Sequence, residues 1–375
     1  MKNFLIILII SLLLNSFYSS FQSSLFHQMN KDKKGENLII SPLSVFQALS
    51  LTANGAQGQT LKEMLELLQS DSLDDLNKKN EEIISVIKGF TTLEIANGIM
   101  TRFNPMKDFS IIAEKQYLAP IEPLESVEQV NEWCKNKTHG KIDKILDKLD
   151  DFTLILILNA VYFKGEWLSK FSPYKTKSLP FYNLGSKEIN VDTMDQISHF
   201  NYYEDKKIQA IELPFKKDYM SAFIILPNEE TDINKYVDTL YLNEEYNNIY
   251  KKLDYVKVHL QLPKFELEFK QNLNQVLKDL GMYDAFILDV ADFSEMRKEK
   301  DLFINQVIHK TYLKVFEDGC EAAAVTVVEG LGAAAPTEEK IFDMKINRPF
   351  LFMLKNNKLP AGYDLVFMSK IEDLS

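Results

Sequence analysis

The chain has 375 residues but only two cysteines, Cys134 and Cys320. Two cysteines cannot form a disulfide framework or a four-ligand metal site. We therefore expect both thiols to be free and to pack as small apolar residues. The alternative is a bond between the two, which would immobilise the segment around Cys320.

Metal-binding and catalytic patterns are also missing. The sequence has no His-Glu-x-x-His motif and no histidine pair at the helical spacing of zinc ligands. It has no Gly-x-Ser-x-Gly elbow for a serine nucleophile and no phosphate-binding loop that ends in Gly-Lys-Ser/Thr. We therefore expect no metal and no cofactor, and we do not expect an enzyme. The five histidines are His27, His139, His199, His259 and His309.

Positive charge is in deficit, with 43 Lys and Arg against 54 Asp and Glu, and the formal net charge is -11. No Lys/Arg-rich block offsets this balance, so nucleic acid and heparin-like polyanions are not expected as partners. The chain also lacks a Pro/Gly/Ser-rich linker and an internal repeat. With 46% hydrophobic residues it can bury a large core, and we predict a single domain over residues 20–375.

The N-terminus has the pattern of a secretory signal peptide, which we place at residues 1–19. Lys2 supplies the positive start, residues 4–14 are almost wholly apolar, and small residues follow. The apolar run is too short to span a bilayer comfortably. The alternative is an apolar helix that stays in the fold, and the cleavage site is left open. We expect a secreted, extracellular protein that has no membrane contact once the signal is removed. Asn136 begins an Asn-Lys-Thr glycosylation pattern inside a helical stretch.

Hydrophobic periodicity and the start and stop signals of helices predict an α+β protein. Helices dominate the N-terminal half and strands the C-terminal half. Ser41 is expected to cap a helix whose first turn holds Pro42. Residues 152–163 are too apolar for a strand with one wet face, so they are predicted to form the buried centre of a large sheet. The expected helices are 17–29, 41–53, 59–68, 73–88, 127–139 and 273–280. The other expected strands are 37–40, 92–101, 189–191, 208–215, 220–226, 256–265, 302–316, 349–354 and 365–371.

Residues 317–336 combine the features of a strand and of a loop. Alternate positions form one face of small, uncharged side chains, which is what a half-buried strand requires. Gly330, Gly332 and Pro336 interrupt the far end, as in an exposed loop. One hypothesis is a segment that can enter a sheet, and the other is an edge strand followed by a surface loop. The small face carries Cys320, Ala322, Ala324, Thr326, Val328 and Gly330.

A third interpretation of this stretch is a dinucleotide-binding loop, because residues 330–335 fit Gly-x-Gly-x-x-Ala. Such a loop must open a helix and continue into a long βαβ unit. Pro336 follows at once and only a short, strand-rich tail remains, so we prefer a flexible loop.

Several motifs occur together in one order along the chain. They are Asn-Leu-Ile-Ile-Ser-Pro-Leu-Ser at 37–44, Asn-Glu-Trp-Cys at 131–134, Leu-Asn-Ala-Val-Tyr-Phe-Lys-Gly-Glu-Trp at 158–167, Leu-Pro-Lys-Phe at 262–265, Val-Ile-His-Lys at 307–310, Glu-Asp-Gly-Cys-Glu-Ala-Ala-Ala at 317–324 and Asn-Arg-Pro-Phe at 347–350. From about residue 21 to 371 the chain resembles the serpin family of protease inhibitors. The resemblance implies three β-sheets, eight or nine helices and an exposed reactive-centre loop at about 317–342.

The resemblance also implies a mechanism and its residues. A target serine protease cuts the loop, stays bound as a covalent acyl complex, and is trapped when the cut segment inserts into the main sheet. The implied hinge is Glu317, Gly319, Cys320, Glu321, Ala322, Ala323, Ala324 and Thr326. The implied sheet-opening cluster is Ser41, Ser44, Asn159 and His309, and the implied top-of-sheet cluster is Trp167, Lys264 and Glu317. Cys320 departs from the family, which usually has Thr or Ser there. It is similar in size, so insertion should survive, and a response of its thiol to oxidation is left open.

The register of the loop places the cut at Ala333–Ala334, with Leu331 as an alternative. No Lys or Arg lies between Glu317 and Glu339, so a trypsin-like target is disfavoured. Ala333 suits an elastase- or subtilisin-like protease, and Leu331 suits a chymotrypsin-like one. A papain-like cysteine protease stays open as a target. The alternative function is a non-inhibitory serpin that acts as carrier, store or chaperone. The expected state is a monomer that can polymerise.

Overall fold

The computed structural model describes residues 20–184, 187–240, 244–320 and 339–375. The predicted hinge residues Glu321, Ala322, Ala323, Ala324 and Thr326 lie outside these ranges. So do the predicted cleavage positions Leu331, Ala333 and Ala334, and the predicted signal peptide.

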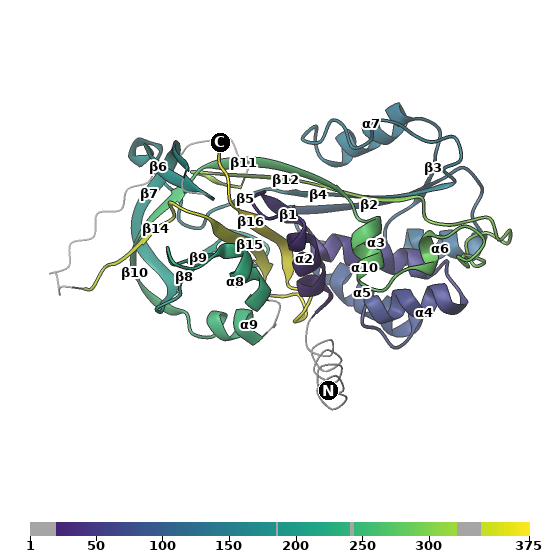
Figure 1. Cartoon of the computed structure of the whole chain (residues 1–375), viewed down its shortest axis with the longest axis horizontal. Coiled ribbons are helices and arrows are strands. Elements are labelled where there is room, and N and C mark those ends of the chain that lie inside the picture. The colour runs from purple at the N-terminus through teal and green to yellow at the C-terminus, as the bar shows by residue number, and fades with distance from the viewer. Residues whose placement is uncertain (1–19, 185–186, 241–243, 321–338) are drawn as a thin grey trace, which may run out of the picture.

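A seven-stranded sheet runs along the length of the molecule (Figure 1). At its centre β4 (Ile155–Phe163) lies between β2 (Leu93–Thr101) and β12 (Gln306–Phe316), and all nine residues of β4 are buried. An apolar run that is buried on both faces was predicted for this segment, and the prediction is confirmed. The outer strands are β3 (Ile121–Pro123) beside β2 and β11 (Phe265–Asn272) beside β12.

The two central strands β4 and β12 are parallel and pair directly from Leu156 with Gln306 to Val161 with Thr311. Above this seam, a two-residue strand β13 (Gly319–Cys320) pairs with the upper end of β12. On its other side, β13 pairs with β5 (Gly165–Glu166), which follows β4 in the chain. The chain after β12 therefore turns back and enters the same sheet at the C-terminal end of β12, between β12 and β5.

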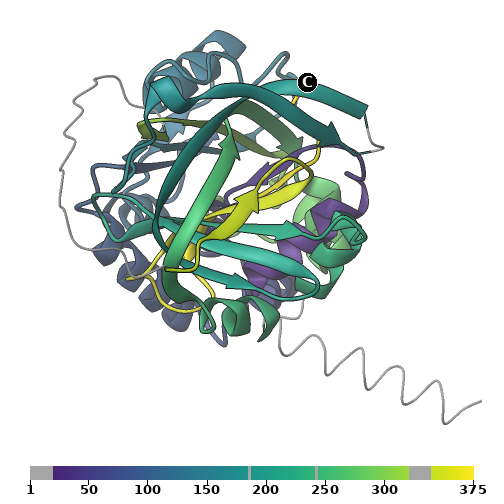
Figure 2. The ribbon, with the colours of Figure 1, turned by 90° about the vertical axis from the view of Figure 1, so that its left-hand side faces the viewer.

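A nine-stranded sheet forms the other end of the molecule. Its strands, in sheet order, are β1 (Leu38–Ile40), β16 (Leu365–Ile371), β15 (Phe350–Asn356), β9 (Met220–Pro227), β8 (Ile208–Pro214), β7 (Lys187–Glu204), β10 (Asp254–Pro263) and β14 (Phe342–Lys345), with β6 (Lys177–Asn183) also on β7. Figure 2 shows the yellow strands β15 and β16 enclosed by the teal and green strands of this sheet. The long strand β7 pairs with β10 and, at its end, with β8. The family resemblance implied three sheets. Within the described residues, two of these three are joined into this one nine-stranded sheet.

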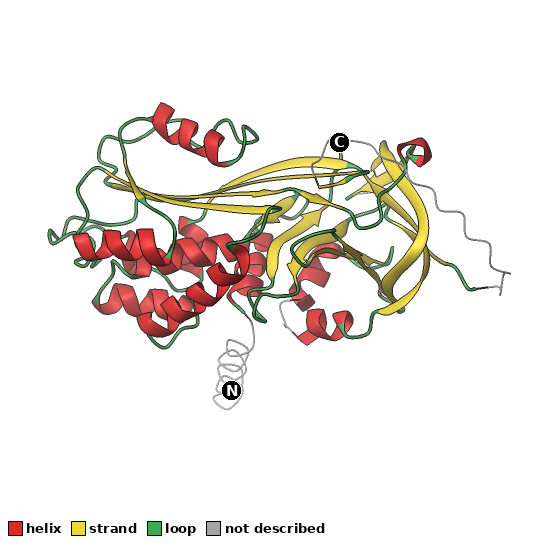
Figure 3. Ribbon diagram, turned by 180° about the vertical axis from the view of Figure 1, so that it is seen from behind, coloured by secondary structure: helices red, strands yellow, loops and turns green. Residues whose placement is uncertain are grey.

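The described residues contain nine α-helices. Figures 1 and 3 show α3, α4, α5 and α6 beneath one face of the seven-stranded sheet, and α7 over the opposite face. The helices are α2 (Phe21–Lys31), α3 (Pro42–Ala53), α4 (Gly58–Leu67), α5 (Leu73–Ile87), α6 (Lys107–Gln116), α7 (Val127–Lys137), α8 (Ile233–Leu240), α9 (Glu244–Tyr250) and α10 (Asn274–Asp279). The predicted α+β fold is confirmed. None of the helices in the described ranges is both long and apolar enough to cross a membrane.

The buried side chains form one large core and one smaller cluster. The smaller cluster joins Val130 and Cys134 of α7 to Leu158 of β4 and to Ile308 and Tyr312 of β12. It therefore lies across the seam between β4 and β12, on the face that α7 covers. Its other members are Met100, Leu124, Ile142, Ile145, Leu146, Leu156 and Ala160.

One local prediction is wrong. Ser41 occupies the cap position of α3, but its hydroxyl makes no capping bond and has no hydrogen-bond partner among the described residues. Instead, its backbone N–H donates to Nε2 of His309 (3.1 Å) and its carbonyl accepts from the hydroxyl of Ser44 (2.9 Å). A contact with a distant strand therefore replaces the local cap.

Candidate functional site

The hinge begins inside the seven-stranded sheet. Gly319 pairs with Phe316 of β12 and Glu166 of β5, and its φ is +149°. A Cβ at this position would lie 1.9 Å from the carbonyl oxygen of Gly165. Only glycine permits this close approach of two backbones.

Cys320 is fully buried and belongs to the main core. Burial raises the pKa of its thiol well above the ordinary value, so the protonated form persists at neutral pH. Oxidants act on an accessible thiolate, so burial protects Cys320 in this state, and its response to oxidation stays a prediction. Cys134 is also buried, and both cysteines are free, as expected.

Glu317 and the preceding Phe316 are held at the top of the sheet by side chains from three other segments. Lys264, between β10 and β11, places Nζ 3.2 Å from Oε1 of Glu317, and the hydroxyl of Thr176 donates to the same oxygen at 2.7 Å. The indole Nε1 of Trp167 donates to the carbonyl of Phe316 at 3.0 Å. The structure thus brings the three residues of the predicted top-of-sheet cluster to one place.

The environment of Glu317 favours its charged form. Burial alone would raise its pKa, but hydrogen bonds from Thr176 and Lys264 outweigh burial and lower it. A second pair lies next to the first, where Nζ of Lys170 is 2.8 Å from Asp318. The sequence reasoning missed Thr176 and Lys170, because both come from an irregular segment with no motif of its own.

The predicted sheet-opening residues meet across the seam. His309 of β12 is paired with Asn159 of β4, and its Nδ1 lies 2.5 Å from the Asn159 carboxamide oxygen. Ser44 donates to the same oxygen at 2.6 Å, and the Asn159 amide donates to Asn97 of β2. One buried network therefore links α3, β2, β4 and β12.

His309 is neutral in this network. Complete burial lowers its pKa from the ordinary value to about 3. Nε2 accepts from the backbone N–H of Ser41, so the ring proton belongs on Nδ1, where it is donated to Asn159. A second proton, on Nε2, would face the backbone N–H of Ser41, which is itself a donor. This contact opposes protonation of His309.

The chain is anchored again just beyond residue 338. β14 pairs in parallel with β10, and Glu339 lies 2.8 Å from Nε2 of His199 on β7. His259 of β10 contacts Asp195 through Nε2 (3.0 Å) and Asp343 of β14 through Nδ1 (2.9 Å). Residues 321–338 thus connect β13 of one sheet to β14 of the other.

Asn136 is exposed near the end of α7, but Thr138 of the same pattern is buried. The hydroxyl of Thr138 donates to the carbonyl of Cys134 at 2.8 Å. Glycosylation at Asn136 stays a prediction.

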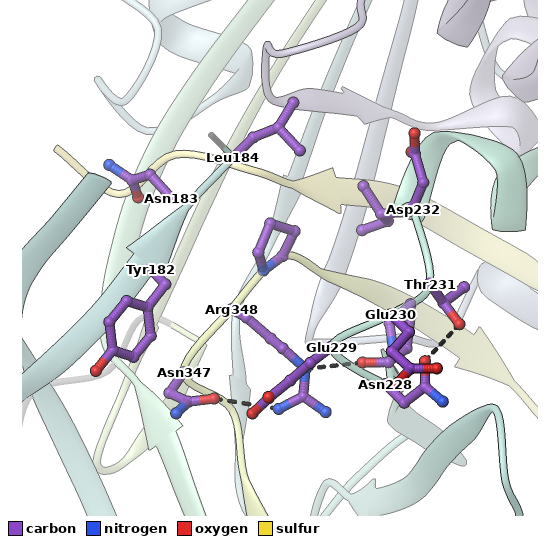
Figure 4. Close-up of a pocket in the computed structure, with 13 residues that line it drawn as sticks. Tyr182, Asn183, Leu184, Asn228, Glu229, Glu230, Thr231, Asp232, Asn347 and Arg348 are labelled. Carbon is purple, nitrogen blue, oxygen red and sulfur yellow. Dashed lines mark hydrogen bonds between the residues drawn. The ribbon is translucent and has the colours of Figure 1, made fainter. Parts of the chain in front are cut away.

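A separate hollow of about 740 Å³ lies near Arg348 (Figure 4). Arg348 is tied to the carbonyl of Pro227 and to the side chain of Asn347. The other charged side chains that line the hollow are the exposed carboxylates Glu229, Glu230 and Asp232. Among the described residues that line this hollow, no nucleophile is paired with a base. Across the described residues, no group of three or more His, Cys, Asp or Glu side chains is placed to hold a metal ion.

Comparisons with known proteins agree with this geometry. A family model described as "Serpin (serine protease inhibitor)" matches residues 17–373. The chain is 31% identical over 364 residues to the leukocyte elastase inhibitor of Xenopus tropicalis, covering 92% of this chain and 96% of that one. It is 31% identical over 368 residues to leukocyte elastase inhibitor A of Mus musculus, with the same coverage. The crystal structure of the thermophilic serpin Tengpin in its native state superposes with a TM-score of 0.86 at 33% identity, covering 96% of this chain and 94% of that one.

Proposed function

The chain belongs to the serpin family, and we propose that it inhibits a serine protease as a suicide substrate. The serine hydroxyl of the target attacks the carbonyl carbon of Ala333. The Ala333–Ala334 peptide bond breaks, a proton passes to the new amino group of Ala334, and Ala333 stays joined to the protease by an ester. The freed segment then enters the seven-stranded sheet between β4 and β12. The inhibitor is consumed in this reaction and does not act as a catalyst.

The observation that carries the proposal is the position of β13. Gly319 and Cys320 already lie in the sheet against β12, directly above the seam where β4 and β12 pair. A strand that continued downward from Cys320 would part these two strands. Because Cys320 faces the core, the alternation of a strand would turn Ala322, Ala324 and Thr326 inward as well.

The energetics favour insertion. About fourteen residues at roughly 3.3 Å each span about 45 Å. A new central strand gains on the order of a dozen backbone hydrogen bonds, each worth roughly 0.5–1.5 kcal/mol net. An inward face of small, uncharged side chains adds burial without an unpaired charge. The native state is thus proposed to lie above its lowest free energy.

We propose an elastase- or subtilisin-like target, since Ala333 is small and no Lys or Arg lies between Glu317 and Glu339. The relatives named leukocyte elastase inhibitor support this class. Cleavage at Leu331 instead would indicate a chymotrypsin-like target, and a papain-like cysteine protease would be a different outcome. We also propose that the protein is secreted after removal of residues 1–19, which N-terminal sequencing of the secreted protein tests.

The deciding experiment is incubation with elastase, subtilisin, chymotrypsin and trypsin. We expect a complex that survives SDS with elastase or subtilisin, and mass spectrometry should show that the released peptide begins at Ala334. A complex with chymotrypsin would instead release a peptide that begins at Gly332. Cleaved protein should melt at a higher temperature than intact protein. If the loop is only clipped and the melting temperature does not rise, the protein is a non-inhibitory serpin that serves as carrier, store or chaperone.

A further inference from the structure

The hollow of about 740 Å³ near Arg348 lies where three connections meet (Figure 4). They join β6 to β7, β9 to α8, and β14 to β15. The backbone N–H of Tyr182, near the end of β6, donates to the carbonyl of Asn347 at 2.8 Å. The backbone N–H of Asn228, just after β9, donates to the carbonyl of Lys207 in the turn between β7 and β8. Hydrogen bonds between distant segments therefore fix each wall of the hollow.

The positive pole of the hollow is the half-buried guanidinium of Arg348. Its Nε donates to the carbonyl of Pro227 at 2.8 Å, and one Nη donates to the carboxamide oxygen of Asn347 at 3.2 Å. Among the described residues, the other Nη has no hydrogen-bond partner and no carboxylate lies within ion-pair distance. Burial lowers the pKa of Arg348 from its ordinary value, so this charge is partly desolvated and not fully compensated. A ligand carboxylate could bind the guanidinium through two parallel hydrogen bonds.

The negative pole is formed by Glu229 and Glu230, which are exposed and follow β9. Neither carboxylate has an ion-pair partner within the part of the chain that the structure describes. Asp232 also lines the hollow, but its carboxylate already accepts from the backbone N–H of Asn234 at 2.8 Å. Glu229 is near enough for its charge to favour the charged form of Arg348, although the two groups do not form an ion pair. Two opposite charges are therefore open to a ligand within one hollow.

Apolar side chains line the remaining surface. Tyr182 is 39% exposed and Leu184 is 43% exposed, and both come from the end of β6 and the residue after it. A methylene chain can cover such surface while it keeps charged groups at its ends in polar surroundings. The other apolar lining residues are Pro227, Ile233 and Pro349.

We propose that this hollow binds an aliphatic ω-amino carboxylate, which is the chemistry of a lysine at the C-terminus of a peptide and of free lysine. The carboxylate would bind Arg348, the methylene chain would contact Tyr182 and Leu184, and the ammonium group would lie at Glu229 and Glu230. None of the described lining residues belongs to the proposed reactive loop. Binding here therefore does not depend on protease inhibition.

The probe is 6-aminohexanoate, with two matched ligands that each lack one charge. Hexanoate lacks the ammonium group, and hexylamine lacks the carboxylate. Saturation-transfer NMR of the ligand, titrated against the full-length protein, measures each affinity. We expect saturable binding of 6-aminohexanoate, and binding roughly tenfold weaker for each matched ligand. Tighter binding of Nα-acetyl-lysine than of lysine would identify a peptide C-terminus as the ligand, and the reverse order would identify the free amino acid.

Charge variants assign the contacts. Arg348→Met should abolish the preference for 6-aminohexanoate over hexylamine, because the ligand carboxylate loses its partner. The double variant Glu229→Gln/Glu230→Gln should abolish the preference over hexanoate. Its matched control is Glu81→Gln/Glu82→Gln, which neutralises two exposed carboxylates of α5 and should leave binding unchanged. Urea midpoints of the free variants check that each one folds.

Three outcomes would each overturn the proposal. They are the absence of saturable binding, equal affinity for 6-aminohexanoate and its two matched ligands, and an effect of the Glu229/Glu230 variant no larger than that of its control. These measurements use intact protein without a protease, so their outcome is separate from the test of inhibition.

Discussion

His309 of β12 and Asn159 of β4 face each other across the parallel seam, joined by a hydrogen bond of 2.5 Å from the imidazole Nδ1–H to the carboxamide oxygen. Any strand that enters between β4 and β12 must break this bond. An intact hydrogen bond between His309 and Asn159 therefore indicates that the sheet is closed between β4 and β12.

The buried imidazole predicts a pH dependence of stability. The pKa of His309 is about 3 in the folded chain, and it is about 6.5 when unfolded. Below pH 6.5 the unfolded state binds a proton that the folded state does not, so stability falls as pH falls, by at most about 1.4 kcal/mol per unit. At about pH 5 the imidazole thus contributes roughly 2 kcal/mol less than at neutral pH.

The variant His309→Gln tests this dependence. We expect it to be less stable than wild type by roughly 2 kcal/mol at neutral pH, because the hydrogen bonds that the imidazole makes with Ser41 and Asn159 are lost. At about pH 5 the difference should nearly vanish. Urea unfolding of both proteins at the two pH values gives the comparison. A difference that is the same at both would show that His309 does not stay neutral in the fold.

The pair of Glu317 and Lys264 predicts a route to polymers. Glu317→Lys replaces the attraction with repulsion between two partly buried ammonium groups and removes the acceptor of Thr176. We expect a loss of about 2 kcal/mol and polymers on mild heating, detected by size-exclusion chromatography. Glu317→Gln, which keeps the shape without the charge, should polymerise less. If Glu317→Lys stays monomeric, the pair does not hold the sheet closed.

The close approach of Gly319 to Gly165 predicts that no side chain is tolerated there. Gly319→Ala should displace β13 and lower stability by roughly 2–3 kcal/mol. Gly89→Ala is the matched control, because a Cβ at Gly89 meets no atom within 4 Å. Thermal melts of both variants check this. Equal melting temperatures would mean that β13 is not seated against β5 in solution.

The two faces of the loop predict opposite effects of one substitution. Thr326→Arg would bury a charge in the inserted strand, whereas Val325→Arg would place it outward. We expect Thr326→Arg to be cleaved as a substrate, with the number of inhibitor molecules used per trapped protease rising roughly tenfold or more. Val325→Arg should change this number little. Titration of residual protease activity measures both, and the reverse result would reject the register.

Long, uniform patterns predicted the fold well. The apolar run of β4 could only be a buried strand, and the spacing within α3 and α5 indicated their helices. Several elements were missed, including the helices α6, α8 and α9. In two of the missed elements the pattern is mixed: Pro180 lies within β6, which argues against a strand, and α6 follows Met106, which offers no capping side chain.

Contacts between distant segments explain the other differences between the predictions from the sequence and the structure. Nothing near Thr176 or Lys170 signals that they meet Glu317 and Asp318, and Ser41 forgoes a local cap for His309. The family motifs identified Lys264, Asn159 and His309, and the structure places each beside its expected neighbour. The roles of these residues stay predictions.

The small hydrophobic cluster beneath α7 has a kinetic consequence. Its side chains from β4 and β12 share one apolar contact surface with α7, so we expect the two strands to stay together while the helix stays docked. Detaching α7 exposes that surface to water before any new strand contact compensates. If a strand inserts as proposed, the lifetime of the closed form should therefore depend on how tightly one short helix is packed, rather than on how much free energy the inserted strand finally releases.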